Sequence, residues 1–192
     1  MPKIVIADRI FSRIHHWPTG PDWFGEGYEL VWPEGYTAEE LVPAMEGAEG
    51  AVTCFDPFTA EMMDAAGGGL KVVAKPGAGY NNIDVGAATE RGVMVCNVEG
   101  VRGPAVAEHA AFMMLYLSRN AWLKGTPEWE STPMQQLKGK VLGIVGLGNI
   151  GAHLAQIAQG FGMKILVHTR TPDPAKAPGV AVAFCSFEEL LA

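Results

Sequence analysis

The chain has 192 residues, enough for one or two domains, and 48% of them are hydrophobic, enough for a packed core. The formal net charge is −7 and no lysine or arginine cluster is present, which argues against a nucleic-acid partner. No apolar run has the length of a signal peptide or a membrane span, so we expect a cytoplasmic protein with no membrane partner. Cys54, Cys96 and Cys185 match no metal-ligand spacing, and we expect small buried residues and no metal.

The first half of the chain alternates between short apolar strands and helices. Strands are expected at 3–7, 28–32, 51–54, 70–74 and 93–96. Helices are expected at 9–16, 38–47, 60–66 and 84–91. Thr37 and Glu40 have the spacing of a capping box, and Thr59 stands at the N-cap of the next helix. This alternation predicts an α/β fold with a parallel sheet and helices on both of its faces.

A long helix is expected over about 104–122, with Pro104 in the first turn, where proline is favoured. Its apolar residues, including Met113 and Trp122, are expected to be core or dimer contacts. The polar segment 124–138 that follows is expected to be a surface connector. We place the domain boundary near residue 103, which gives domains 1–103 and 104–192.

A glycine-rich turn begins the last part of the chain. Residues 141–145 have the composition of a buried parallel strand, and Gly146, Gly148 and Gly151 follow with G-x-G-x-x-G spacing before an apolar helical pattern at 152–161. The first glycine permits a tight turn, the second lets a pyrophosphate approach the backbone, and the third allows close packing of helix on strand. The N–H groups of the new helix, including those of Asn149 and Ile150, would face the phosphates. The alternative is a plain glycine-rich turn of an α/β protein.

The second strand of this unit, at 164–168, predicts the coenzyme. NAD-specific sites place an acidic residue at its end, but this chain has Thr169 followed by Arg170. Without a carboxylate nothing repels a 2′-phosphate, and a guanidinium binds phosphate well, so NADP is preferred and NAD is possible. The alternatives are that Arg170 stacks on adenine or faces solvent, and that Asp173 approaches the ribose. A third strand is expected at 180–184 and a short helix at 186–191.

Three motifs, in this order, give the chain a resemblance to the D-isomer-specific 2-hydroxyacid dehydrogenases. They are KPGAGYNNID at 75–84, NVEG at 97–100 with AVAEH at 105–109, and LKGKV at 137–141 leading into GLGNIG at 146–151. Asn81 stands where an aspartate is common in the family. The resemblance implies a flavodoxin-like substrate domain followed by the first half of a Rossmann doubly wound parallel sheet.

The resemblance also implies hydride transfer between NAD(P)H and a small 2-oxo acid. The substrate carboxylate would meet the backbone N–H groups of Ala78 and Gly79, because a glycine-rich turn after a strand presents unpaired amides. The alternative is that Gly77 and Gly79 only permit the turn. Selectivity among acids would come from Tyr80 and the loop at 55–58, and a homodimer is expected of the full-length protein through the arm that includes Trp129.

The family's catalytic Arg, Glu and His motifs cannot be found before Ala192, so no catalytic residue is expected in this chain, which is interpreted as an N-terminal portion that does not turn over alone. Glu108 and His109 are adjacent on a helix and do not face each other, so His109 is expected to be structural. His15, His16, His153 and His168 have no carboxylate at useful spacing, and each is expected to be exposed or satisfied. The alternative function is a non-catalytic NAD(P)-binding module, akin to a corepressor or a redox sensor.

Overall fold

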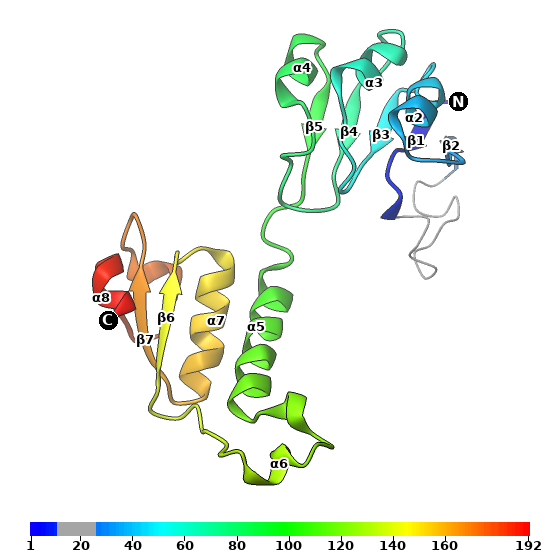
Figure 1. The fold of residues 1–192 in the computed structure, drawn as a ribbon. Helices are drawn as coiled ribbons and strands as arrows, with labels where there is room; N and C mark the ends of the chain where they lie inside the picture. Colours follow the sequence, from blue (N-terminus) through cyan, green and yellow to red (C-terminus); the bar gives the residue numbers. More distant parts are fainter. Residues whose placement is uncertain (11–25) are drawn as a thin grey trace. The chain divides into compact units, whose positions relative to one another are not determined.

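The computed structural model describes residues 1–10 and 26–192, and these form two compact units, Met1–Glu99 and Gly100–Ala192. Each unit is built on its own parallel sheet (Figure 1). Most of the helix expected at 9–16, with His15 and His16, lies outside the described residues.

The sheet of the first unit has five parallel strands in the order β2-β1-β3-β4-β5, which is the flavodoxin-like order. Val5 of β1 lies opposite Val31 of β2 on one side and Ala51 of β3 on the other, so β1 is an interior strand of the sheet. The predicted α/β fold is confirmed, with strands somewhat shorter at their ends than expected. The strands are β1 (Lys3–Ile6), β2 (Glu29–Val31), β3 (Gly50–Val52), β4 (Val72–Ala74) and β5 (Met94–Cys96).

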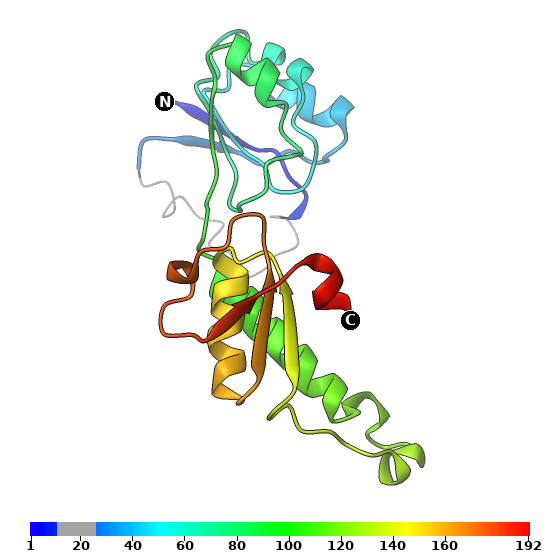
Figure 2. The same cartoon turned by 90° about the vertical axis from the view of Figure 1, so that its left-hand side faces the viewer.

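Three helices cover one face of this sheet (Figure 2). At the start of the first, the Glu40 carboxylate accepts hydrogen bonds from the N–H and the hydroxyl of Thr37, at 3.0 and 2.8 Å. Thr59 accepts a bond from the N–H of Met62, as its N-cap position predicts. The sequence predicts helices on both faces of this sheet. Among the described residues, the helices of this unit lie on this one face. The helices are α2 (Ala38–Ala44), α3 (Ala60–Ala65) and α4 (Val85–Glu90).

The core of the first unit lies between the sheet and these helices. Val5 and Val73 of the central strands are fully buried, and Phe58 and Met63 are almost so. Each such side chain contributes about 1.5–3 kcal/mol to folding through the apolar surface it removes from water. Cys54 is buried as expected, but the prediction was wrong for Cys96, which is exposed because it ends β5 at the edge of the sheet.

The sheet of the second unit has three parallel strands in the order β6-β7-β8. These are the first three strands of a Rossmann-type sheet, as predicted. On one face lies α7, with α5 packed against it, and α8 lies on the other face (Figures 1 and 2). The elements are α5 (Gly103–Ser118), η2 (Ala121–Leu123), α6 (Glu128–Ser131), β6 (Val141–Val145), α7 (Asn149–Gly160), β7 (Lys164–His168), η3 (Pro174–Lys176), β8 (Val182–Phe184) and α8 (Phe187–Leu191).

The long helix α5 ends earlier than expected, and it buries only small residues. It ends at Ser118 rather than near 122, because Asn120 adopts a left-handed conformation with φ of 49°. The residues that it buries are all small: Gly103, Ala107 and Ala111. Met113 and Trp122 are 39% and 47% exposed, so the core role is wrong for them, and the expected dimer contact stays a prediction. Across the described residues, no helix combines the length and apolar character needed to cross a membrane.

Candidate functional site

The glycine-rich turn after β6 has the backbone geometry that the motif predicts. Gly146 has φ of +91°, a conformation that favours glycine, and its N–H donates to the carbonyl of His168 at 2.7 Å. A Cβ on Gly151 would lie 2.4 Å from the carbonyl oxygen of Gly146 and 3.2 Å from Cγ2 of Ile144. Only glycine therefore allows α7 to start so close to β6. At Gly148 a Cβ would meet nothing within 4 Å, so that position faces open space.

The N–H groups at the start of α7 are free to bind a ligand. Within residues 1–10 and 26–192, no acceptor bonds to the N–H groups of residues 147–151, and no side chain caps the helix. The first intrahelical bond runs from Ala152 to the carbonyl of Gly148 at 2.9 Å. Because unpaired N–H groups and the helix dipole both favour negative charge, a pyrophosphate fits this turn.

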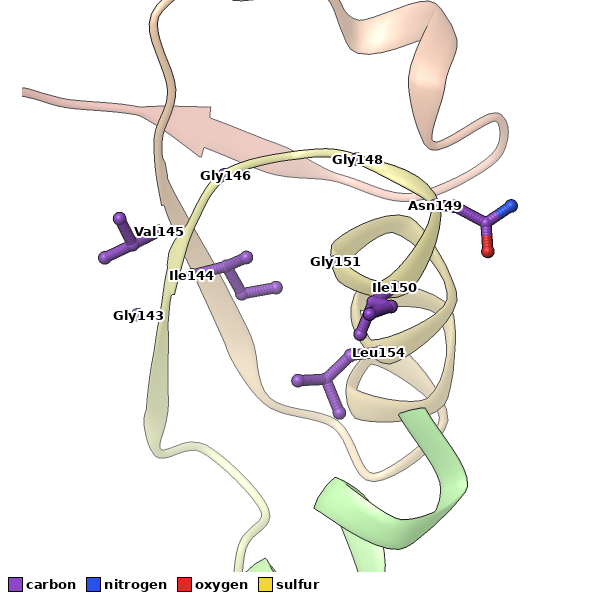
Figure 3. A pocket seen from close by; sticks show the side chains of 9 residues that line it. All are labelled: Gly143, Ile144, Val145, Gly146, Gly148, Asn149, Ile150, Gly151 and Leu154. Carbon is purple, nitrogen blue, oxygen red and sulfur yellow. The ribbon is translucent and has the colours of Figure 1, made fainter. Parts of the chain in front are cut away.

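A cavity of about 620 Å³ opens between β6 and the first turns of α7. Figure 3 shows the apolar side chains of Ile144, Ile150 and Leu154 directed into it, whereas Asn149 points away. The structure thus brings together five of the seven residues predicted for the coenzyme. These are Gly146, Gly148, Asn149, Ile150 and Gly151.

The other two predicted coenzyme residues, Thr169 and Arg170, do not line this cavity. They directly follow β7, whose last carbonyl, that of His168, bonds to Gly146, so they lie at the same edge of the sheet as the turn. Arg170 is exposed. The Asp173 carboxylate accepts a bond from the N–H of Ala175 at 2.9 Å, so it caps η3.

A second cavity, of about 490 Å³, shares Gly148 and Asn149 with the first. His153 and Gln156 line it from α7, and Lys176 lines it from η3. The Nδ1 atom of His153 is buried without a hydrogen-bond partner in the described part of the chain, so the expectation that this histidine is exposed or satisfied was wrong. Sequence reasoning missed this cavity, although positions 149, 153 and 156 have the spacing of one helix face.

In the first unit, Ala78 and Gly79 lie in an exposed turn after β4. The turn is held from behind, because the carbonyl of Ala78 accepts a bond from the Asn97 side chain at 2.8 Å and the carbonyl of Gly77 accepts one from the N–H of Val98 at 3.1 Å. No acceptor among the described residues uses the N–H groups of residues 78–82. This turn can therefore bind an anion through its backbone.

A buried carboxylate, that of Asp8, lies behind the neighbouring loop. Its Oδ2 accepts the N–H groups of Cys54 and Asp56, both at 2.7 Å, and that of Phe55. Its Oδ1 accepts the N–H of Ile10 at 2.9 Å. Burial alone would raise the pKa of Asp8, but these backbone bonds outweigh it and hold the pKa below its usual value.

None of the described histidines forms a dyad with a carboxylate. His109 is exposed and its ring lies 6.0 Å from that of Phe112. The Nδ1 atom of His168 lies 3.2 Å from the carbonyl oxygen of Cys185. The expectation that His109 and Glu108 do not form a preformed acid–base pair agrees with this arrangement.

The fold and the two turns define an α/β protein in which a flavodoxin-like unit precedes the first strands of a Rossmann-type sheet. The model of the D-isomer specific 2-hydroxyacid dehydrogenase catalytic domain matches residues 9–187. The chain therefore belongs to this family.

Individual relatives agree with the family assignment. The chain is 38% identical over 135 residues to a glyoxylate reductase of Thermococcus litoralis, a match covering 64% of this chain and 41% of that protein. It is 32% identical over 199 residues to a D-3-phosphoglycerate dehydrogenase of Mycobacterium tuberculosis, covering 100% of this chain and 36% of that protein. The crystal structure of a glyoxylate reductase from Paecilomyes thermophila superposes with a TM-score of 0.78 at 28% identity, covering 100% of this chain and 62% of that one. The chain thus spans well under half the length of these two curated relatives.

Proposed function

We propose that this chain supplies the coenzyme-binding and substrate-binding turns of an NAD(P)-dependent dehydrogenase that acts on small 2-hydroxy acids of the D configuration. The observation that carries the proposal is the pair of turns with free amides, one at 147–151 and one at 78–82, each at the carboxyl end of a parallel sheet. Ligands of such sheets bind at that edge.

In this proposal the N–H groups of Asn149 and Ile150 bind the coenzyme pyrophosphate, while Gly146, Gly148 and Gly151 shape the turn. Ala78 and Gly79 bind the substrate carboxylate through their N–H groups. The coenzyme, when bound, supplies or accepts the hydride at the 2-carbon of the acid. The names of the relatives support glyoxylate, hydroxypyruvate or a phosphoglycerate-type acid as substrate.

We propose NADP as the preferred coenzyme, with NAD as the second choice. Thr169 leaves no carboxylate to repel a 2′-phosphate, and the exposed Arg170 is free to swing toward one from the end of β7. Lys176, which lines the cavity beside Gly148, adds a second cation near the turn. Both features favour the more negative coenzyme.

We also propose that the working protein is a cytoplasmic homodimer. The support is the outer face of α5, where Phe112 and Leu117 are each 55% exposed, followed by the α6 segment that resembles the family's arm. Apolar surface of this kind is typical of a protein–protein contact.

One experiment tests the function. The purified chain is titrated with NADH and NADPH by the change in nicotinamide fluorescence, and is then assayed with glyoxylate and hydroxypyruvate. We expect binding of both coenzymes, tighter for NADPH, and a Gly151→Ala variant that binds neither well. Absence of coenzyme binding by the wild-type chain would refute the proposal.

A non-catalytic NAD(P)-binding module is the second candidate. It is favoured by one observation: no histidine in the described part of the chain bonds to a carboxylate, so the general acid that hydride transfer requires is not assembled there. The same assay separates the two candidates when it is run on a protein that also carries the catalytic Arg, Glu and His motifs, because the dehydrogenase would then oxidise NAD(P)H in the presence of a 2-oxo acid, whereas the module would bind coenzyme without oxidising it.

A further inference from the structure

Lys75 is a buried cation with no acidic partner among the described residues. It directly follows β4 and is 8% exposed. Its Nζ donates to the carbonyl oxygen of Cys54 and to Oδ1 of Asn82, the latter at 2.9 Å. Burial of an ammonium group is costly unless its hydrogen bonds are satisfied, so the two neutral acceptors hold this side chain in place.

Asn82 extends this contact into a bridge between two turns. Its Nδ2 donates to the carbonyl of Asp56 at 2.8 Å, and its own carbonyl accepts the N–H of Phe58, also at 2.8 Å. The N–H of Asp84 then donates to the carbonyl of Phe58 at 3.1 Å. The loop at 53–58 and the turn at 77–82, which we call the substrate turn, are therefore tied together by Lys75 and Asn82.

The loop at 53–58 is held from two sides. Asp8 accepts the N–H of Cys54, while Lys75 donates to the carbonyl of the same residue. The ammonium also lies 5.6 Å from the ring centroid of Phe55, whose side chain is 66% exposed. A cation over the ring face favours this ring position. Lys75 thus positions both the backbone of the loop and an exposed aromatic ring beside the substrate turn.

We propose that Lys75 and Asn82 are positioning residues that hold the substrate turn and the 53–58 loop in one fixed geometry. The inference rests on the proposed function, in which the free N–H groups of Ala78 and Gly79 bind a carboxylate. A lysine suits this role because one ammonium can donate to two acceptors on different segments and still face an aromatic ring. Asn82 suits it because its Oδ1 accepts from Lys75, while its Nδ2 donates to the carbonyl of Asp56 in the 53–58 loop.

The first arm of the test needs no ligand. Amide hydrogen exchange of Phe58 and Asp84, whose bonds join the two segments, is compared in the whole chain between wild type, Lys75→Met and Asn82→Ala. We expect about tenfold faster exchange at both amides, the effect of losing one hydrogen bond. Lys71→Met, which removes an exposed lysine paired with Glu49, is the matched control and should leave both rates unchanged. Unchanged exchange in both test variants would overturn the proposal.

The second arm measures binding of oxalate, a stable analogue of a 2-oxo acid, from the NMR shifts of the Ala78 and Gly79 amides. We expect the dissociation constant to rise about tenfold in Lys75→Met and Asn82→Ala under conditions where both are folded. Leu41→Ala removes a buried core side chain of α2, outside the two tied segments, so it should lower the melting temperature without changing the oxalate affinity. This control separates positioning from a general loss of stability.

The outcomes of the two arms are distinguishable. If wild type binds no oxalate, the proposed substrate site is wrong, and the exchange arm still decides whether the bridge holds the two segments. If wild type binds oxalate and Lys75→Met binds it equally well, the positioning role is wrong and the proposed function stands.

Discussion

The two units present free amides at the carboxyl edge of a parallel sheet, but they fix the geometry of those amides by different means. In the first unit, Asp8, Thr53, Asp56 and Lys75 are buried and bond to the backbone of the loops; in the described residues of the second unit no polar side chain is buried to the same degree. There the turn is shaped by steric contact, as between Gly151 and the carbonyl of Gly146. Polar anchoring depends on charge, whereas close packing depends on the absence of a side chain. Loss of a charged side chain should therefore disturb the first turn, whereas addition of a side chain should disturb the second.

The largest effect is expected from removing the buried carboxylate of Asp8, which accepts bonds from three amides of the 53–58 loop. Asp8→Ala leaves several buried N–H groups unpaired, and we expect it to lower the free energy of unfolding of the first unit by about 3 kcal/mol. Urea unfolding followed by circular dichroism measures the change. Asp64→Ala, which breaks an exposed pair with Arg91, is the control and should shift the midpoint little. An equal effect of the two substitutions would show that burial does not distinguish them.

The next largest effect is expected at the glycine-rich turn after β6, where steric contact sets the geometry. Gly151→Ala places a Cβ against the Gly146 carbonyl, and we expect coenzyme affinity to fall about 100-fold, because the turn must open to relieve the contact. Fluorescence titration with NADPH gives the dissociation constant. In Gly160→Ala the added methyl group meets nothing within 4 Å, so this control should bind as wild type does. Wild-type affinity in Gly151→Ala would contradict the steric account.

A smaller effect on coenzyme affinity is expected when a charge is added to the second unit at the end of β7. Thr169→Asp places a carboxylate where it would repel a 2′-phosphate and accept a bond from a ribose hydroxyl. We expect the ratio of NADPH to NADH affinity to fall about tenfold. Arg170→Ala should weaken NADPH binding and leave NADH binding nearly unchanged. If Thr169→Asp weakens both coenzymes equally, the end of β7 does not select between them.

The smallest expected effect is a pH dependence of the free energy of unfolding that comes from the carboxylate of Asp8. The pKa of Asp8 is lower in the folded chain than its usual value of 3.8, so the carboxylate stabilises the fold above that pH, and the stabilisation is lost as the pH falls through the lowered pKa. The difference in unfolding free energy between wild type and Asp8→Asn should be constant near neutral pH and should shrink below about pH 4. A difference that does not change in acid would show that the charge of Asp8 is not what anchors the loop.

The elements that the sequence predicts correctly depend on local patterns. The strands at β1 and β6 are continuous apolar runs, and the turn after β6 follows from the spacing of Gly146 and Gly151. For the substrate turn, the glycines at 77 and 79 indicate where amides are free. Each of these features is encoded within about ten neighbouring residues, so a single sequence is enough to find it.

The features that the sequence does not predict join distant segments. The bonds of Asp8 to the amides of the 53–58 loop, and those of Lys75 to Cys54 and Asn82, connect residues with no common periodicity. The residues that α5 buries are hard to predict for a related reason: apolar content indicates burial, but the residues buried in α5 and in the neighbouring α7 are all small. Which residues face a neighbour is decided by the tertiary structure.

The small-residue contact between α5 and α7 has a practical consequence for protein engineering. Gly103, Ala107 and Ala111 are buried in α5, and Ala152, Ala155 and Ala158 in α7, so the helices approach through their backbones. The large apolar side chains of Phe112 and Leu117 in α5 are instead each 55% exposed. A designer can therefore place charged residues at these two positions to break the proposed dimer contact without adding bulk between α5 and α7.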